Sequence, residues 1–331
     1  MRKRRATITW GALAFAWLAA SACAGSDVDE GAQAPTVAPN TSTSTPSVLP
    51  GDVQPVELQA VNDFLYQLQE LDLAAVGRSA YDMIVMDYSA DGTEAGAYTR
   101  AQIEGLKRSP GGPKIVLAYM SIGEAEEYRY YWQPGWRAGN PRWLDQPNPT
   151  WVHNHKVQYW DSQWQQIIFA YTDRLIDAGF DGAYLDIIDG FEYFESKGRG
   201  SAAQEMAAFV AAIAAHARRP DIDFLIFPQN GAALARLVPD YLNSVDGIGQ
   251  EDTYYGYDED NVRTPADATA EIESDLDLFR AAGKLVLTVD YATAPANIDD
   301  AYKKSFAKGY VPFVTTRDLD TLTINRGHEP D

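Results

Sequence analysis

The run at residues 114–121 reads KIVLAYMS, and apolar side chains occupy neighbouring as well as alternate positions in it. Such a run predicts a strand of a parallel sheet, because a parallel sheet is covered on both faces and needs no polar alternation. Other runs of this kind predict further strands: FLYQL at 64–68, MIVMDY at 83–88, GAYLD at 182–186, FLIFP at 224–228, GIGQE at 247–251, LVLTVDY at 285–291 and VPFVT at 311–315.

The segments between these runs predict helices, near residues 99–107, 162–178, 202–217, 268–282 and 299–308. Strands that alternate with helices in this way predict an α/β protein, a single-domain (β/α)8 TIM barrel over residues 53–331. A doubly wound open sheet is the alternative. It usually has fewer strands and a Gly-rich phosphate-binding turn after the first strand, which this sequence lacks.

The N-terminus predicts export as a lipoprotein, with a signal peptide at residues 1–22. Four basic residues precede an apolar stretch at 8–20, which is shorter than the roughly 20 residues that cross a bilayer. Cys23, the only cysteine in the chain, follows small residues and is expected to carry the lipid anchor. The alternative is an ordinary signal peptide followed by an unrelated cysteine, but free thiols are uncommon in exported proteins.

Residues 23–52 are rich in Pro, Ser and Thr and predict a disordered tether between the lipid and the barrel. The sequence therefore predicts a protein held at the extracytoplasmic face of the cell membrane, with membrane contact only through the anchor. We expect the protein to be a monomer.

The formal net charge is −20, and loss of the signal peptide would remove four basic residues more. A body of this charge is expected to repel nucleic acid and anionic lipid and to attract a polycation. The alternative is that the acidity only keeps an exported protein soluble.

Polar residues follow several predicted strands, at the end where a barrel builds its active site. A single carboxylate there is often a helix cap, whereas several that converge on one rim cost stability unless a function keeps them. The residues are Asp87, Tyr88, Tyr119, Glu124, Asp186, Asp189, Gln229, Asn230, Glu251, Tyr254, Asp290 and Tyr291.

Converging carboxylates beside aromatic rings predict glycoside hydrolysis, in which one carboxyl group protonates the leaving oxygen and another attacks or activates water. The loop at 128–160, which includes Trp143, is rich in Trp and Tyr and is expected to supply rings for sugar faces. No Gly-x-Ser-x-Gly elbow is present. The pair His153 and His155 has metal-ligand spacing but lies in that loop, so no metal or cofactor is predicted. An all-carboxylate Mg²⁺ or Ca²⁺ site is the alternative.

The strand-end motifs resemble those of glycoside hydrolase family 114, the endo-α-1,4-polygalactosaminidase-like barrels. The resemblance covers roughly residues 58–321. The motifs are YDMIVMDYSADG at 81–92, KIVLAYMSIGEAEEYRYYW at 114–132, GFDGAYLDIIDGFEYF at 179–194, PQNG at 228–231, GIGQEDTYY at 247–255 and LVLTVDYA at 285–292.

The resemblance implies an exported enzyme that cleaves α-1,4 linkages in galactosamine-rich polysaccharide and requires no metal. Asp186 and Glu251 match the family's carboxylates on the fourth and sixth strands, so they are expected to be the catalytic pair. Which of them is the acid stays open, and Asp189 competes with Asp186. The other strand-end residues and Trp143 are expected to bind substrate.

A glycan-binding barrel without turnover is the alternative to an enzyme. Binding alone needs aromatic rings and amides more than it needs a carboxylate pair, so the presence of both Asp186 and Glu251 favours the enzyme.

Overall fold

The parallel strands of a barrel dominate the computed structural model, which describes residues 57–219 and 223–331. The predicted signal peptide, Cys23 and almost all of the tether lie outside these residues. The barrel strands are β1 (Phe64–Tyr66), β2 (Met83–Met86), β5 (Ile115–Ser121), β9 (Gly182–Asp186), β10 (Leu225–Pro228), β11 (Gly247–Glu251), β12 (Leu285–Tyr291) and β13 (Val311–Thr315).

All strand runs read from the sequence are confirmed. They pair in chain order and in parallel, as a five-stranded sheet β1-β2-β5-β9-β10 and a three-stranded sheet β11-β12-β13. The fold is the expected α/β TIM barrel.

The two sheets meet along two seams. At the first, an isolated parallel bridge joins Gln229 to Gly249, and the Asn230 amide donates to the Gly249 carbonyl over 2.8 Å. At the second, the rings of Phe64 on β1 and Phe313 on β13 pack with centroids 5.6 Å apart. The first contact joins β10 to β11 and the second joins β1 to β13, so the edge strands of the two sheets lie against each other.

The glycines of β11 make room for large side chains inside the barrel. A Cβ atom on Gly247 would lie 2.1 Å from the Phe227 ring, and one on Gly249 would lie 1.7 Å from the Tyr184 hydroxyl oxygen. Both distances are far below van der Waals contact, so a larger residue would displace these rings. The Gly-rich composition of this strand therefore reflects a closely packed interior.

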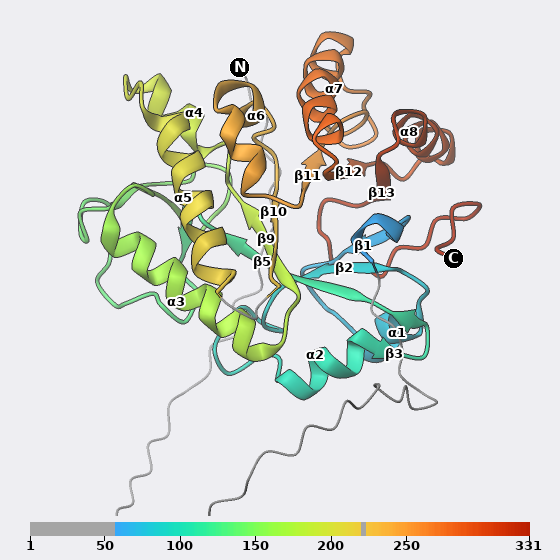
Figure 1. Ribbon diagram of the computed structural model, residues 1–331, viewed down its shortest axis with the longest axis horizontal. Helices are drawn as coiled ribbons and strands as arrows, with labels where there is room; N and C mark the ends of the chain where they lie inside the picture. The colour runs from blue at the N-terminus through green and yellow to red at the C-terminus, as the bar shows by residue number, and fades with distance from the viewer. Residues whose placement is uncertain (1–56, 220–222) are drawn as a thin grey trace, which may run out of the picture. The chain divides into compact units, whose positions relative to one another are not determined.

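Helices surround the strands (Figure 1). The longer ones confirm the predicted helices to within a few residues at their ends, whereas three short ones carried too little periodicity to be predicted. They are α1 (Leu73–Arg78), α2 (Arg100–Lys107), α3 (Ser162–Ala178), α4 (Gly190–Ser196), α5 (Ala202–Ala217), α6 (Leu234–Leu237), α7 (Ala266–Ala281) and α8 (Pro295–Lys308), with 3₁₀ turns η1 (Leu58–Ala60) and η2 (Pro239–Asn243).

Local signals fix the helix ends. A capping box between Thr99 and Gln102 starts α2, and the Asp161 side chain accepts a hydrogen bond from the Gln163 amide at the start of α3. Gly179, with φ of 87°, ends α3 in the left-handed conformation that glycine adopts without strain. None of the described helices is both long and apolar enough to cross a membrane.

A loop is predicted for the aromatic segment after β5, but the segment folds into an antiparallel sheet of its own. Its strands are β6 (Glu124–Glu126), β7 (Leu144–Pro147) and β8 (Asn154–Val157), in the order β6-β8-β7. A short hairpin, β3 (Arg108–Ser109) and β4 (Gly112–Pro113), follows α2.

The tryptophans of this segment pack on one another. Trp143 lies between Trp136 and Trp164, at centroid distances of 4.9 and 5.0 Å, and is only 1% exposed. It offers no ring face to a sugar. The prediction that Trp143 binds substrate is therefore wrong, since the aromatic density of this segment largely serves its own core.

Candidate active site

Side chains from six strand ends meet at the mouth of the barrel. We call them the mouth cluster: Tyr66, Tyr119, Asp186, Gln229, Asn230, Glu251 and Tyr291. Hydrogen bonds connect them in pairs, as in the bond from the Tyr66 hydroxyl to Gln229 Oε1 over 2.8 Å. The cluster brings together Asp186 and Glu251, the two carboxyl groups expected to react.

Asp186 is the last residue of β9 and is partly exposed. Its Oδ2 accepts a hydrogen bond from the Tyr119 hydroxyl over 2.6 Å, and its Oδ1 accepts one from the Ile187 amide over 2.7 Å. Burial raises the pKa of Asp186 well above its ordinary value, and the nearby charge of Glu251 adds to the rise, against the lowering effect of the two hydrogen bonds. The protonated form of Asp186 is thus favoured here.

Glu251 is the last residue of β11, and both of its oxygens accept hydrogen bonds. The Tyr291 hydroxyl donates to Oε1, and the Asn230 amide nitrogen donates to Oε2 over 2.9 Å. Asn230 also accepts a bond from the Glu251 backbone amide, over 3.0 Å, and holds a left-handed conformation with φ of 63°. Asn230 and Tyr291, expected to bind sugar, therefore hold the carboxyl group of Glu251 in place.

Two more acidic residues lie beside the pair. Asp189 starts α4, and its charge contributes to the raised pKa of Asp186. Asp252 was not among the expected site residues, although it directly follows Glu251. The pKa of Asp252 is raised to about 6, chiefly by burial and also by the charge of Glu251, against the lowering effect of its ion pair with Arg317 over 2.9 Å. All four carboxyl groups are partly exposed.

Three predicted residues point toward the surrounding helices instead. Tyr88 packs edge to face on Tyr171 of α3, with centroids 5.1 Å apart. The Tyr254 hydroxyl donates to Glu273 of α7 over 3.1 Å. Asp290 Oδ1 accepts bonds from two backbone amides, the one of Tyr254 at 2.6 Å. The predictions that Tyr88, Tyr254 and Asp290 bind substrate are therefore wrong, because these side chains are almost completely buried.

Glu124 lies next to the mouth, but its carboxyl group is fully buried. Its Oε1 accepts bonds from Lys156 over 3.0 Å and from Asn148 over 2.8 Å, which join β6 to the strands beside it. The structure thus contradicts the prediction that Glu124 contacts substrate, because the residue anchors the small sheet.

Asp87 does point inward, and the buried guanidinium of Arg129 engages both of its oxygens, over 2.8 and 2.7 Å. Arg129 also pairs with Glu126 over 2.6 Å. This ion pair leaves Asp87 little capacity for a sugar amine. Sequence reasoning missed Arg129, since its long side chain reaches the barrel from the loop after β6.

The His-x-His pair of the aromatic segment contacts a carboxylate. His153 Nδ1 and His155 Nε2 lie 2.8 and 2.7 Å from the two oxygens of Glu127. Within residues 57–219 and 223–331, no group of three or more His, Cys, Asp or Glu side chains is arranged to hold a metal ion.

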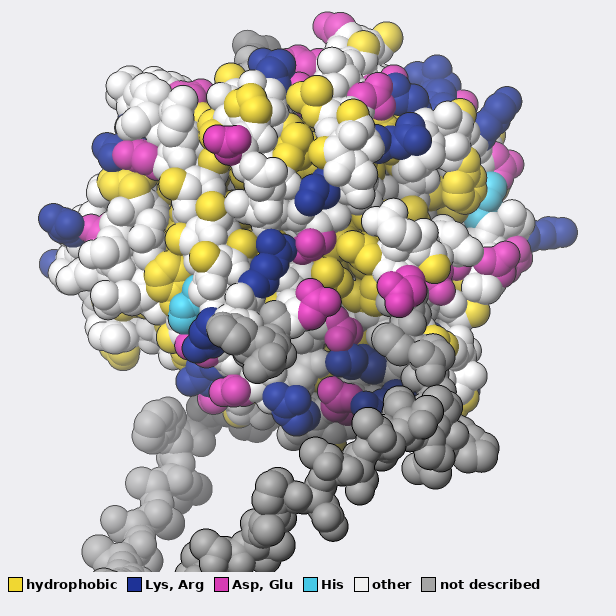
Figure 2. Space-filling view, in the orientation of Figure 1, with side chains coloured by type: hydrophobic (Ala, Val, Ile, Leu, Met, Phe, Trp, Pro, Cys, Tyr) yellow, Lys and Arg dark blue, Asp and Glu magenta, His cyan; other side chains and the backbone are white. Residues whose placement is uncertain are grey.

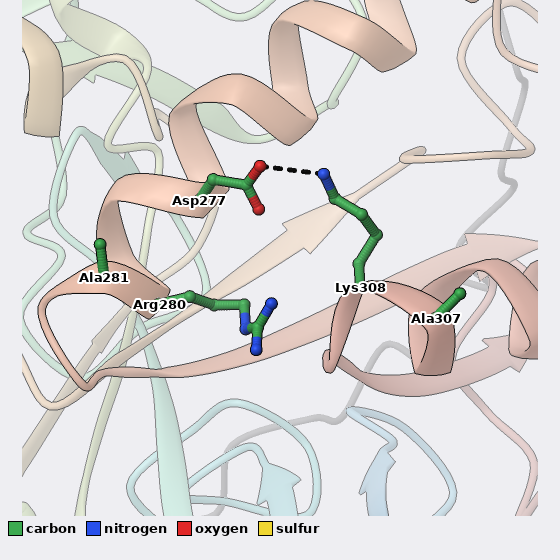
Figure 3. Close-up of a pocket in the computed structure, with 5 residues that line it drawn as sticks. All are labelled: Asp277, Arg280, Ala281, Ala307 and Lys308. Carbon is green, nitrogen blue, oxygen red and sulfur yellow. Dashed lines mark hydrogen bonds and ion pairs between the residues drawn. The ribbon is translucent and has the colours of Figure 1, made fainter.

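A surface pocket lies at the other end of the barrel (Figure 3). It is lined by the last turns of α7 and α8, which lead back to the amino ends of the following strands. Lys308 pairs there with Asp277 over 2.9 Å, and Arg280 lies beside them. Cations near helix carboxyl ends offset the helix dipole, so these side chains have a structural role.

Comparison with known proteins places this mouth in a wider context. The model of glycoside-hydrolase family GH114 matches residues 45–329. An uncharacterized protein of Methanocaldococcus jannaschii is 40% identical over 271 residues, 78% of this chain and 77% of that protein. An uncharacterized protein of Deinococcus radiodurans is 41% identical over 257 residues, 77% and 79% of the two chains.

Two solved structures share the fold. The glycoside hydrolase domain of PelA from Pseudomonas aeruginosa superposes with a TM-score of 0.62 at 21% identity, over 80% of this chain and 98% of that domain. Ega3 of Aspergillus fumigatus, solved in complex with galactosamine, gives a TM-score of 0.59 at 17% identity, over 82% of this chain and 98% of Ega3.

Proposed function

This chain belongs to glycoside-hydrolase family GH114 and is a glycoside hydrolase, and we propose that it cleaves α-1,4 linkages in galactosamine-rich polysaccharide with Asp186 and Glu251 as the reacting carboxyl groups. One observation carries the assignment of the pair. The two side chains end strands of the same barrel, and each has two hydrogen-bond donors that fix it at the mouth.

The charge state of the pair suits this chemistry. Glycoside hydrolysis needs one protonated carboxyl group to donate to the leaving oxygen and one carboxylate to attack the sugar or activate water. Burial and the charge of Glu251 raise the pKa of Asp186, which favours the protonated form of this carboxyl group. Each side chain is held by a tyrosine hydroxyl, from Tyr119 or Tyr291, so neither has to be ordered when substrate binds.

The acidic surroundings support an amino sugar as substrate. Asp189 adds negative charge beside the pair, where a sugar ammonium group would be stabilised, whereas the charge of Asp252 is engaged by Arg317. The galactosamine complex of Ega3, which shares the fold, supports the same substrate class. A neutral glycan would gain nothing from these charges.

A panel of polysaccharides tests the function. The purified barrel is incubated with galactosamine polymers of graded acetylation, with chitosan and with a neutral glucan, and the products are analysed by mass spectrometry. We expect oligosaccharides from the galactosamine polymers only. If no polymer in the panel is cut, or if only the neutral glucan is cut, the proposed substrate is wrong.

Salt is expected to weaken substrate binding. The chain has a net charge of −20, and a cationic polymer is attracted to it through forces that salt screens over about 10 Å at 0.1 M. Acidic and basic side chains intersperse on the face that Figure 2 draws, so we assign the attraction to the net charge of the chain and not to one acidic patch of this face. KM should rise several-fold as NaCl is raised from about 0.02 M to about 0.5 M, while kcat stays constant. An unchanged KM would indicate a neutral or N-acetylated substrate.

We also propose that lipid on Cys23 holds the enzyme at the extracytoplasmic face of the membrane. Cys23→Ser is expected to move the protein from the membrane fraction to the soluble exported fraction, because it removes the acylated side chain. Thermal unfolding of the barrel should not change, since Cys23 lies outside the barrel residues. Cell fractionation with immunoblotting measures the shift, and a variant that stays in the membrane fraction would contradict the anchor.

A further inference from the structure

Arg317, two residues beyond β13, is fixed by the loop that follows β11. Its Nη2 donates to Asp252 Oδ1 over 2.9 Å and to the Gly256 carbonyl over 2.8 Å, and its Nε donates to Asp260 Oδ1 over 2.9 Å. Only 24% of its side chain is exposed. Three acceptors thus hold the plane of the guanidinium in one orientation.

The guanidinium lies over the ring of Tyr291. Its Cζ is 3.9 Å from the ring centroid, close for a cation and an aromatic face. The loop passes tightly around this stack, since a Cβ atom on Gly256 would lie 2.2 Å from Asp252 Oδ1 and 2.9 Å from Arg317 Nη2. Gly256 has φ of 116°, so this close approach requires glycine.

Tyr291 connects this stack to the reacting pair. Its ring is buried, and its hydroxyl donates to Glu251 Oε1. The plane of the ring therefore determines where the hydroxyl lies, and one face of that plane is set by Arg317. A cation over the ring also makes the phenol a better hydrogen-bond donor, because it withdraws electron density from the ring.

We propose that Arg317 is a positioning residue of this hydrolase, which holds the Tyr291 hydroxyl against Glu251 without touching the substrate. The inference rests on the proposed function in one respect, namely that Glu251 is a reacting carboxyl group. It assigns a role in turnover to a residue that lies 66 positions from Glu251 in the sequence and outside the mouth cluster.

A double-mutant cycle tests the proposal. Arg317→Met keeps an unbranched, though shorter, side chain and removes the cation, and we expect kcat to fall by about tenfold to 100-fold with KM nearly unchanged. The kcat of Tyr291→Phe should fall by a similar or larger factor. The double variant Arg317→Met/Tyr291→Phe should be no worse than Tyr291→Phe alone, because the arginine acts through the hydroxyl. If the factors by which the two single substitutions lower kcat multiply in the double variant, the proposal is overturned.

Arg263 provides a matched control. It also pairs with an aspartate, Asp300, over 2.7 Å and lies 5.9 Å from the ring of a tyrosine, Tyr255, but these partners do not contact Glu251 in the described structure. Arg263→Met should keep the wild-type kcat. If Arg263→Met lowers kcat as much as Arg317→Met does, then loss of any ion pair of this loop impairs turnover, and the specific role of Arg317 is overturned.

Arg317→Lys covers the case in which Arg317→Met does not fold. Lysine keeps the positive charge but lacks the planar guanidinium group, so the kcat of this variant should lie between those of the wild type and of Arg317→Met. Its thermal unfolding midpoint should equal that of the wild type. A folded Lys variant with the full wild-type kcat would contradict the proposal. Failure of the proposed function is seen separately, as a wild type that cuts no polymer or a Glu251→Gln variant that stays active.

Discussion

Asp186→Asn and Glu251→Gln are each expected to abolish turnover while the fold is kept. Both changes preserve the shape of the side chain and remove a carboxyl group that the reaction needs. General acid–base help alone contributes typically about 10² to 10⁴-fold, so each variant should lose at least that factor in kcat. The double variant should be little worse than the poorer single variant, because the two groups act as a unit. Initial rates on the galactosamine polymer measure the effect.

Two controls accompany this experiment. Asp189→Asn should lose less activity, mainly through KM, because we place Asp189 beside the sugar amine and not at the bond that breaks. Asp258→Asn alters an exposed carboxyl group of the loop after β11 and should behave as wild type. If Asp189→Asn were inactive while Asp186→Asn kept its activity, the assignment within the segment DIID would be wrong. If all of these variants kept normal rates, the carboxylate mechanism would be wrong.

Asp290→Asn is expected to stabilise the protein above pH 7. Asp290 is completely buried, its Oδ2 has no hydrogen-bond partner among the described residues, and burial raises its pKa to about 7. Its ordinary value is about 3.9, so between about pH 4 and 7 the folded state binds a proton that the unfolded state releases. The free energy of unfolding of the wild type therefore falls as pH rises through this window. The asparagine side chain of the variant does not titrate, and it avoids the buried charge.

Urea unfolding at several pH values measures this effect. The variant should be more stable than the wild type by about 2 kcal/mol at pH 8, a figure reduced from the full pKa shift because the amide accepts the two backbone bonds less strongly. The difference should shrink as pH falls toward 4. Asp63 and Asp252, whose pKa values burial raises to about 6, should leave a residual slope in the variant. A variant that is less stable than the wild type at pH 8 would show that the charge of Asp290 stabilises the fold.

The strands of this barrel could be predicted from the sequence more reliably than the direction of their side chains. A run such as LVLTVDY is apolar on both faces, so its pattern does not indicate which residue points inward. Asp290 and Tyr291 are neighbours and appeared equivalent, yet only Tyr291 enters the barrel. The same ambiguity led to the incorrect prediction for Tyr88 beside Asp87.

Residues that act over long sequence distances could not be predicted at all. Arg129 and Arg317 reach the site from loops, and nothing in their local sequence indicates which strand end they contact. Tyr66 lies in an apolar strand, where a tyrosine is equally suited to the core. By contrast, the position of Asp186 and Glu251 at the mouth could be predicted, because each ends a predicted strand and the carboxyl ends of the strands meet at one rim of a barrel.

The seam between β10 and β11 has a mechanical consequence for the reaction. Asp186 belongs to the five-stranded sheet and Glu251 to the three-stranded one, so the two carboxyl groups that we propose to react lie on opposite sides of the boundary between the sheets. A shift of one sheet along the other would change the distance between the two carboxyl groups, and with it the space for the glycosidic bond. Asn230 lies just after the last strand of the first sheet, and its side chain binds both the backbone amide and the carboxyl group of Glu251. Asn230 therefore helps to keep the distance between the two carboxyl groups constant.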